Sequence, residues 1–276
     1  MKKIVVPTDF SDVAQNALVY ALELAKTFEA EIYLVHTYTL PIVEHQFAPQ
    51  NYQVLFDSLE WTNFELFKQE MPAIHALAET HKAGHIRITP VVMDGDLLFN
   101  LKEFIANEKA DFVVMGTSGT SGWKEYFLGS NTAEAITNLN VPVMSVPVTA
   151  RYDGINTLGF TTRFREKDKA ALDQVIALAK GLHAQVHCLY VETKDTDNTP
   201  ATYEDWKDHY RHDPVAFHII PNENIEETIT DFIMSESIDV MAMLTYKRNF
   251  FAQLFLESVT EKMVNHASIP ILALHE

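Results

Sequence analysis

Apolar and polar positions follow two alternating patterns along the first half of the chain. Short apolar runs rich in β-branched residues predict buried strands at 4–6, 31–36, 86–93, 112–115 and 142–147. Between them, apolar residues recur every three or four positions and predict helices at about 12–25, 51–82, 97–105 and 130–139. Strands that alternate with helices indicate a parallel sheet with helices on both faces, in a doubly wound α/β topology. Ligands of such folds bind at the carboxyl ends of the strands.

The predicted helix at 51–82 carries an aromatic stripe and an internal Pro72, which predicts a kink. Packing against the sheet is the favoured interpretation of the stripe, and a ligand or partner surface is the alternative. The residues of the stripe are Phe56, Trp61, Phe64 and Phe67.

The pattern then starts again in the second half of the chain. A shift of 154 residues aligns Leu24-Ala25-Lys26 with Leu178-Ala179-Lys180, and a shift of 128 residues aligns Asp111 with Asp239. Such internal similarity indicates a tandem repeat of one structural unit. We therefore expect two Rossmann-like domains, 1–150 and 151–276, each with a five-stranded parallel sheet.

Composition narrows the classes of function. Of the 276 residues 47% are apolar and 21% are charged, as in soluble globular proteins. We expect no transmembrane helix and no signal peptide, because apolar runs are short and Met1-Lys2-Lys3 leads straight into a strand. The single Cys188 excludes an intrachain disulfide and fits a reducing cytoplasm, as a small buried residue. A net charge of −17, with both halves acidic, disfavours nucleic acid and anionic lipid as partners.

A glycine-punctuated loop is the strongest candidate for chemistry. Gly116-Thr117-Ser118-Gly119 follows a predicted strand, and Gly129-Ser130-Asn131-Thr132 comes nine residues later with Ser130 as a candidate helix N-cap. Glycines let a phosphate approach the backbone, and the amides and positive dipole at a helix start favour an anion. The loop therefore predicts an anion site.

The full spacing, G-x2-G-x9-G-[S/T], resembles the nucleotide-binding signature of the universal stress protein family. The segment from Ile4 to Ser11 is similar to the first strand and adenine-side loop of that family. The resemblance implies binding of ATP or a related adenine nucleotide, with Mg²⁺ as a candidate companion ion. It implies adenine contacts from Pro7, Thr8, Asp9 and the backbone of Val35, ribose contacts from Met115 and Gly116, and phosphate contacts from Ser118, Gly119, Gly129, Ser130, Asn131 and Thr132.

Two positions depart from the commonest form of that signature. Ser118 stands where His or Arg is frequent, and Asn131 stands where a β-branched apolar residue is common. Both side chains form hydrogen bonds, so we expect weaker affinity rather than loss of binding.

The second copy lacks the glycines of the first. At the shift of 128, Leu244, Lys247 and Glu257 replace the three glycines. Near the start of each repeat the shift is about 154, and Asp9 falls opposite Thr162 or Arg163, depending on where a one-residue insertion lies. A carboxylate at the helix start repels a polyphosphate. We therefore expect the second domain not to bind ATP in the family manner.

Dedicated catalytic machinery is missing from the sequence. It contains no Walker-type loop, no Gly-x-Ser-x-Gly elbow and no His-Glu-x-x-His. Asp9 and Asp94 are candidates for Mg²⁺ or a ribose hydroxyl, but no general base or arginine finger stands beside them, so we expect slow ATP hydrolysis at most. The segment His209-x2-His212-Asp213 has metal-ligand types, and a surface cluster is the favoured interpretation over zinc.

Two functions of different class remain open. The first is a nucleotide-sensing stress protein with a protein partner that the sequence does not identify. The second is a module that binds a lipid or apolar metabolite against the aromatic-rich helix or in the second domain.

The last predicted strands, 141–146 and 269–274, are apolar and occupy equivalent places, so we expect them to pair within one chain as an intramolecular pseudo-dimer. Independent domains on a linker, with further homodimer formation through either edge, are the alternative.

Overall fold

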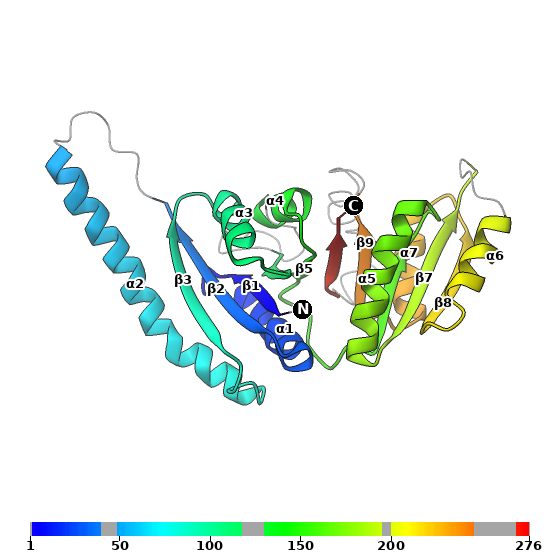
Figure 1. The fold of residues 1–276 in the computed structure, drawn as a ribbon, viewed down its shortest axis with the longest axis horizontal. Coiled ribbons are helices and arrows are strands. Elements are labelled where there is room, and N and C mark those ends of the chain that lie inside the picture. The colour runs from blue at the N-terminus through cyan, green and yellow to red at the C-terminus, as the bar shows by residue number, and fades with distance from the viewer. Residues whose placement is uncertain (1, 40–48, 118–129, 195–199, 246–268, 276) are drawn as a thin grey trace. The chain divides into compact units, whose positions relative to one another are not determined.

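The structure is a computed structural model that describes residues 2–39, 49–117, 130–194, 200–245 and 269–275, apart from the side chains of 49–56 and 200. By its contacts the chain divides into two compact units, Met1–Met115 and Gly116–Glu276. Figure 1 colours the chain from blue at the N-terminus to red at the C-terminus. The domain boundary expected near residue 150 stays a prediction.

The first unit is a parallel sheet with the strand order β3-β2-β1-β4. Each strand is joined to the next by a helix, as the alternating sequence pattern predicts (Figure 1). The elements are β1 (Lys3–Pro7), α1 (Asp12–Phe28), β2 (Glu31–Tyr38), α2 (Pro49–Thr80), β3 (Ile88–Asp94), α3 (Leu97–Glu108) and β4 (Phe112–Gly116).

Local sequence signals set the ends of α1 and α3. Ser11 is the N-cap of α1 and accepts a hydrogen bond from the amide of Ala14, and Asp96 caps α3 through the amide of Phe99. Both helices end at a residue in the left-handed conformation, Glu29 and Lys109. The core of the unit lies where the buried face of α1 meets strand β1, which is buried from Ile4 to Pro7.

The long helix α2 is continuous through Pro72. Its aromatic stripe does not pack against the sheet along the whole length of the helix. Phe67 is buried, whereas Trp61 is 64% exposed and Phe64 is 51% exposed. A helix of this length spans about 48 Å, whereas the seven residues of the edge strand β3 span about 23 Å. The packing interpretation is therefore right for Phe67 and wrong for Trp61 and Phe64.

The second unit contains a mixed, mostly parallel sheet with the order β5-β10-β9-β6-β7-β8. Its elements are α4 (Ser130–Asn138), β5 (Val143–Val146), β6 (Thr157–Thr161), α5 (Glu166–Leu182), β7 (Gln185–Glu192), α6 (Pro200–His209), β8 (Val215–Pro221), α7 (Ile225–Ser235), β9 (Val240–Leu244) and β10 (Ile271–Leu274). Together the units confirm the Rossmann-like α/β class expected from the sequence.

The pair β5–β10 is the antiparallel step of this sheet. Met144 lies opposite Leu272, and Val143 lies opposite Ala273. The buried hydroxyl of Ser145 donates a hydrogen bond to the carbonyl of Ile271 at 3.3 Å. The two strands that the sequence selects as pairing partners are therefore neighbours within the second unit.

Two further expectations concern burial and helix length. Cys188 is completely buried, as a small residue of the core. Among the described residues, no helix is both long enough and apolar enough to cross a lipid bilayer.

Candidate functional site

The loop after β1 is held in place by the end of β2. The amide of Thr8 donates a hydrogen bond to the carbonyl of Val35 at 2.8 Å, and Nδ1 of His36 lies 2.9 Å from the carbonyl of Thr8. Because a carbonyl can only accept, Nδ1 of His36 carries the proton. Val35 itself is fully buried, so it acts on the loop through its backbone.

Asp9 stands exposed in this loop, just before the start of α1. Its Oδ1 accepts hydrogen bonds from the amide of Ser11 at 3.1 Å and from the Ser11 hydroxyl. A carboxylate that accepts from the amide two residues on closes an Asx-turn, and negative charge is favourable beside a helix N-terminus. The carboxylate of Asp9 is thus fixed at the carboxyl end of β1.

Two aromatic contacts of this loop were not foreseen from the sequence. The ring of Phe10 lies 4.9 Å from the ring of His36 and meets Phe67 of α2 edge-on at 5.2 Å. Phe10 has a φ of 63°, held by a hydrogen bond from its amide to Oγ1 of Thr8. The sequence offered one signal for these contacts, the aromatic residue directly after Asp9. The direction of its ring depends on a positive φ, which cannot be inferred from sequence at such a position.

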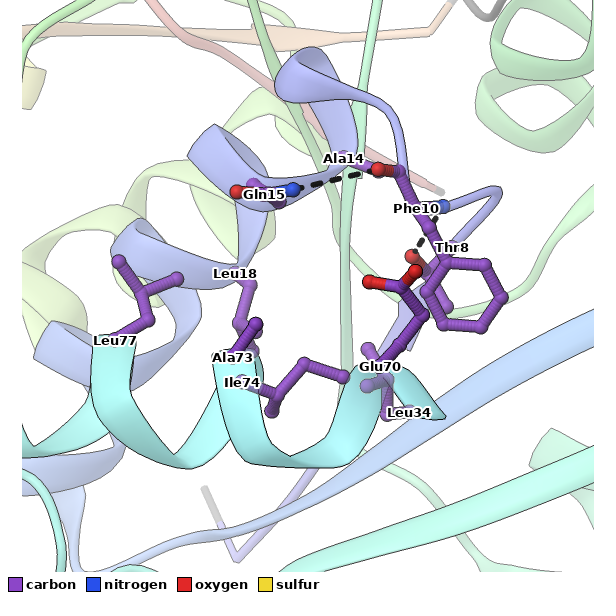
Figure 2. Close-up of a pocket in the computed structure, with 10 residues that line it drawn as sticks. All are labelled: Thr8, Phe10, Ala14, Gln15, Leu18, Leu34, Glu70, Ala73, Ile74 and Leu77. Carbon is purple, nitrogen blue, oxygen red and sulfur yellow. Dashed lines mark hydrogen bonds between the residues drawn. The ribbon is translucent and has the colours of Figure 1, made fainter. Parts of the chain in front are cut away.

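A small cavity lies beneath the loop, between α1 and α2 (Figure 2). Its volume is about 20 Å³, so it has room for about one water molecule and none for a purine base. Leu18, Leu34 and Ile74 supply apolar walls, and Glu70 of α2 reaches toward Phe10 in Figure 2. This cavity is therefore not a nucleotide pocket.

Three of the residues expected on the phosphate side, Ser130, Asn131 and Thr132, lie at the start of α4. The hydroxyl of Thr132 donates a hydrogen bond to the carbonyl of Gly116 at 2.8 Å, and Thr132 is only 2% exposed. This contact ties the first turn of α4 to the end of β4. Ser130 and Asn131 are exposed at the helix start, and Met115 is buried in β4. Ser118, Gly119 and Gly129 lie outside the described residues.

This arrangement suits an anion. The first amides of α4 have no partner within the helix, and the helix dipole places partial positive charge there. The hydroxyl of Thr132 is directed to the protein backbone, so its contribution in the structure is to position the helix start. Ser130 and Asn131 are exposed at this point, and their phosphate contacts stay a prediction.

The second repeat forms the same backbone loop after β6. The amide of Thr162 donates to the carbonyl of Leu189 at 2.9 Å, and the amide of Phe164 donates to Oγ1 of Thr162 at 2.8 Å. Phe164 has a φ of 54°. Each of these residues is 154 positions after its counterpart in the first repeat, so Arg163 rather than Thr162 stands where the first repeat has Asp9.

The second loop is closed from inside by Asp168, a residue of α5 that is completely buried. Its Oδ2 accepts hydrogen bonds from the amide of Arg163 at 2.8 Å, from the amide of Arg165 at 3.2 Å and from the hydroxyl of Thr162 at 3.0 Å. The equivalent residue of the first repeat is Ala14. The second repeat thus satisfies its loop amides internally, while the first carries an exposed carboxylate.

The end of β9 also differs from the end of β4. Leu244 stands at the position of Gly116 and is 3% exposed. A buried leucine fills the place in which a glycine lets a ligand approach the backbone. Lys247 and Glu257 lie outside the described residues.

A second candidate site is an open groove in the first unit, with a volume of about 910 Å³. It lies between α2 and the ends of β2 and β3 and includes the exposed rings of Trp61 and Phe64, whose centroids are 5.9 Å apart. Phe67, Met71 and Val92 extend the apolar lining. Asp94, the second candidate ligand for Mg²⁺, lies in this groove, and its carbonyl accepts a hydrogen bond from Asn100 at 2.7 Å.

The residues of the His209–Asp213 segment do not converge on one point. Asp213 accepts a hydrogen bond from Nζ of Lys180 at 2.7 Å, and Nε2 of His212 accepts from Nε of Arg211 at 3.0 Å. The ring of His209 packs edge-on against Tyr210 at 4.6 Å. These separate partners favour the surface-cluster interpretation of this segment.

Comparison with known sequences decides the family. The sequence model of the universal stress protein family matches residues 1–147 and matches again at residues 158–275. The chain belongs to the universal stress protein family. The two matches confirm that it is a tandem member, as the internal repeat predicts. A universal stress protein of Methanocaldococcus jannaschii is 31% identical over 146 residues, which are 52% of this chain and 81% of that protein.

Solved universal stress proteins have the same fold along the whole chain. One from Archaeoglobus fulgidus DSM 4304 has a TM-score of 0.71 at 18% identity, covering 99% of this chain and 96% of that chain. A universal stress protein from Pseudomonas aeruginosa UCBPP-PA14 has a TM-score of 0.67 at 12% identity, covering 100% of this chain and 93% of that chain. At this level of identity the likeness shows the shared α/β fold.

Proposed function

We propose that the first repeat binds ATP or a related adenine nucleotide, and that the protein is a stress-response sensor or regulator rather than a dedicated enzyme. The hydrogen bond from Thr132 to Gly116 carries this proposal, because it holds a helix N-terminus at the carboxyl end of a parallel strand. That is the place in which doubly wound folds bind nucleotides. In the sequence, the other two glycines of the family signature stand between Gly116 and the start of α4.

The loop after β1 supports the adenine end of the proposal. Its fixed, exposed Asp9 offers a carboxylate to nucleoside hydrogen-bond donors, with Pro7 and Thr8 shaping the turn. The remaining proposed phosphate contacts are Ser118, Gly119 and Gly129, which lie outside the described residues. Carboxylate oxygens are suitable ligands for Mg²⁺, so Asp9 and Asp94 are its candidates in this chain.

A sensor role fits the chemistry of the described residues. Bound ATP would supply a polyphosphate whose charge the helix start and loop amides stabilise. Hydrolysis would also need a group that positions water and a cation that stabilises charge in the transition state. Neither is among the proposed site residues, so turnover is expected to be slow and binding to be the signal.

Calorimetric titration with ATP tests the proposal. We expect one site per chain, and Gly129→Glu should abolish binding because it places a carboxylate at the start of α4. The matched control is Ser258→Ala in the second repeat, which should leave the titration unchanged while Ser130→Ala weakens it. A stoichiometry near two, or binding that survives Gly129→Glu, contradicts the proposal.

We further propose that domains 1–150 and 151–276 form an intramolecular pseudo-dimer. The antiparallel pairing of β5 with β10 supports it, because each is the last strand of its repeat and neither is left as an apolar edge. This proposal leaves a protein partner and further homodimer formation open to the same chain.

The groove beside α2 favours a second candidate function, the binding of a lipid or apolar metabolite. The exposed Trp61 and Phe64 are the observation that favours it, because large exposed rings over a groove of this volume mark ligand surfaces. Native mass spectrometry of purified protein distinguishes the two functions. An apolar ligand lost in Trp61→Ala but kept in Asp9→Asn supports the groove, and the reverse pattern with a nucleotide supports the glycine loop.

A further inference from the structure

Two histidines and a glutamate meet beneath α7 in the second unit. One nitrogen from His187, one from His218 and one carboxylate oxygen of Glu236 all lie within 4.8 Å of one another. His187 comes from β7, His218 from β8, and Glu236 is the residue that caps the C-terminus of α7. Three sequence segments thus supply one ligand atom each.

Sheet register explains why the two rings share one face. His187 pairs with Ala216 across the parallel strands, and His218 is two residues further along β8. Side chains two residues apart in a strand point to the same face. The rings stack at 5.1 Å with an angle of 18°, and Phe232 of α7 packs edge-on against His218 at 5.1 Å. The cluster is therefore enclosed between the sheet and α7.

The inward-facing nitrogens lack hydrogen bonds. Nδ1 of His187 and Nε2 of His218 are buried and have no hydrogen-bond partner among the described residues. Oε2 of Glu236 lies 3.0 Å from Nδ1 of His187, so this nitrogen has a close carboxylate neighbour without the geometry of a hydrogen bond. Buried polar atoms without partners are rare in folded proteins and are costly. A ligand that accepts lone pairs from both rings would remove that cost.

The donor set identifies the ligand class. Two imidazole nitrogens and one carboxylate oxygen are typical of transition-metal sites in which water or a substrate fills the remaining positions. Calcium and magnesium prefer oxygen ligands throughout.

We propose that His187, His218 and Glu236 form a binding site for one divalent transition-metal ion, with Zn²⁺ as the best-fitting ion. Ligands at Zn²⁺ distances lie about 3.3 Å apart in a tetrahedral site. In the structure the three candidate ligand atoms lie within 4.8 Å of one another. The side chains of His187 and Glu236 are 22% and 31% exposed, so the cluster lies near the surface of the unit although its nitrogens are buried.

Binding of Zn²⁺ alone to the chelator-treated full-length protein tests the site. Equilibrium dialysis should give one ion per chain, and His187→Ala and His218→Ala should each weaken binding by about 100-fold or more, since even outer partners of a metal site contribute 10- to 100-fold. His212→Ala is the matched control, because its ring belongs to the surface segment with a different partner. That variant should bind Zn²⁺ as the parent does.

A spectroscopic measurement on the unmodified protein tests the site even if the variants fail to fold. Co²⁺ added to the unmodified protein should give an intense visible absorption band, which four- or five-coordinate sites show and hydrated Co²⁺ does not. Zn²⁺ should remove the band, and a large excess of Ca²⁺ should leave it. Absence of the band, or Zn²⁺ affinity unchanged in folded His187→Ala and His218→Ala, overturns the proposal. ATP binding is expected to be unaffected by these variants, so the two sites are tested separately.

Discussion

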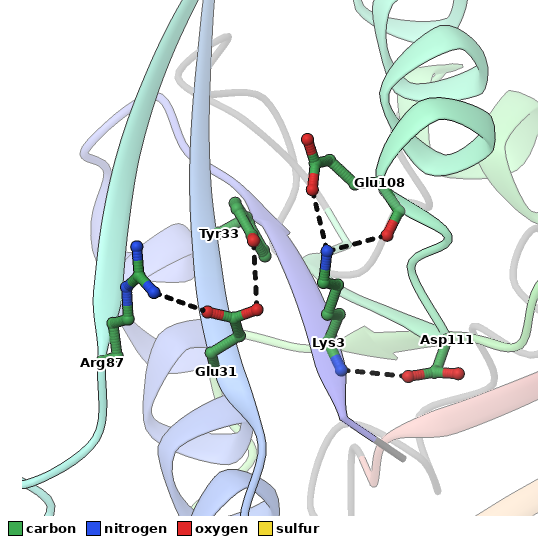
Figure 3. Close-up of polar contacts among 6 residues, drawn as sticks. All are labelled: Lys3, Glu31, Tyr33, Arg87, Glu108 and Asp111. Carbon is green, nitrogen blue, oxygen red and sulfur yellow. Dashed lines mark hydrogen bonds and ion pairs between the residues drawn. The ribbon is translucent and has the colours of Figure 1, made fainter.

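Asp111 and Asp239, which are 128 residues apart, make the same pair of hydrogen bonds in their two repeats. The Asp111 carboxylate accepts from the amides of Lys2 and Lys3 at 2.7 and 3.0 Å, and Asp239 accepts from those of Asn156 and Thr157 at 2.7 and 2.9 Å. Each aspartate thus holds the start of the first strand of its repeat. Figure 3 shows Asp111 beside Lys3, whose Nζ also pairs with Glu108 at 2.8 Å.

These carboxylates should contribute unequally to stability. Asp239→Ala should lower the free energy of unfolding by about 1–2 kcal/mol, and Asp111→Ala by about 1 kcal/mol or less, because the bonds of Asp111 are solvent-exposed. Urea denaturation measures both values. Asp231→Ala on the exposed side of α7 is the control and should change little. If both substitutions leave the free energy of unfolding almost unchanged, these hydrogen bonds do not contribute to stability.

Asp9→Asn should weaken ATP binding by about tenfold to a hundredfold, because a charged hydrogen-bond partner contributes about 1.5–3 kcal/mol. Asparagine keeps an oxygen for the amide of Ser11, so the loop should keep its shape. Calorimetric titration gives the dissociation constant. Ser11→Ala separates charge from loop structure, since it removes the N-cap and leaves the carboxylate. If Ser11→Ala weakens binding as strongly as Asp9→Asn, the carboxylate has no direct role.

Thr132→Val tests how the start of α4 is positioned. The substitution keeps the shape of the side chain but leaves the carbonyl of Gly116 without its hydroxyl donor, so stability should fall by about 1–3 kcal/mol. We expect ATP affinity to fall by about tenfold as the helix start loosens. Thr137→Val is the matched control, because that hydroxyl donates to Ala133 within the same helix and is exposed. Equal ATP affinity in both variants would remove Thr132 from the site.

A disulfide across β5 and β10 tests whether the last strands pair within one chain. Met144 and Leu272 lie directly opposite each other, and opposite residues of antiparallel strands have Cα atoms about 4.5–5.5 Å apart, within the range of a disulfide. Met144→Cys with Leu272→Cys should therefore form an intrachain bond on oxidation. Met144→Cys with Leu274→Cys, two residues out of register, should not. A covalent dimer on a non-reducing gel would instead indicate pairing between chains.

His275 should make the protein sensitive to mild acid. Burial lowers the pKa of this ring below its usual value of 6.5. As the pH falls through 6.5, the unfolded chain takes up a proton that the folded chain does not, so the free energy of unfolding decreases. Above pH 6.5 this contribution to stability is complete. Thermal unfolding at several pH values should show that acid lowers the stability of His275→Asn less than that of the parent. The control is His85→Asn at an exposed position, which should lose stability in acid as the parent does.

The sequence by itself determined the elements, the tandem repeat and the family. Hydrophobic period is a local property, so the five strands of the first repeat and their helices follow from it. The glycine spacing at 116–132 is equally local, and it indicates a candidate site without reference to any tertiary contact. Exposure along α2 was a different matter, because a stripe of period 3.6 does not say how far the sheet extends beneath it. Phe67 is therefore buried, whereas Trp61 is exposed.

Only the tertiary structure decided which distant residues meet. His187, His218 and Glu236 are separated by 31 and 18 residues, and strand register and the end of α7 bring them together. The closure of the second loop by Asp168 was hidden in the same way, because a carboxylate at that position is also an ordinary first-turn residue of a helix. Pattern and propensity act over a few neighbouring residues, whereas these contacts depend on how whole strands and helices pack.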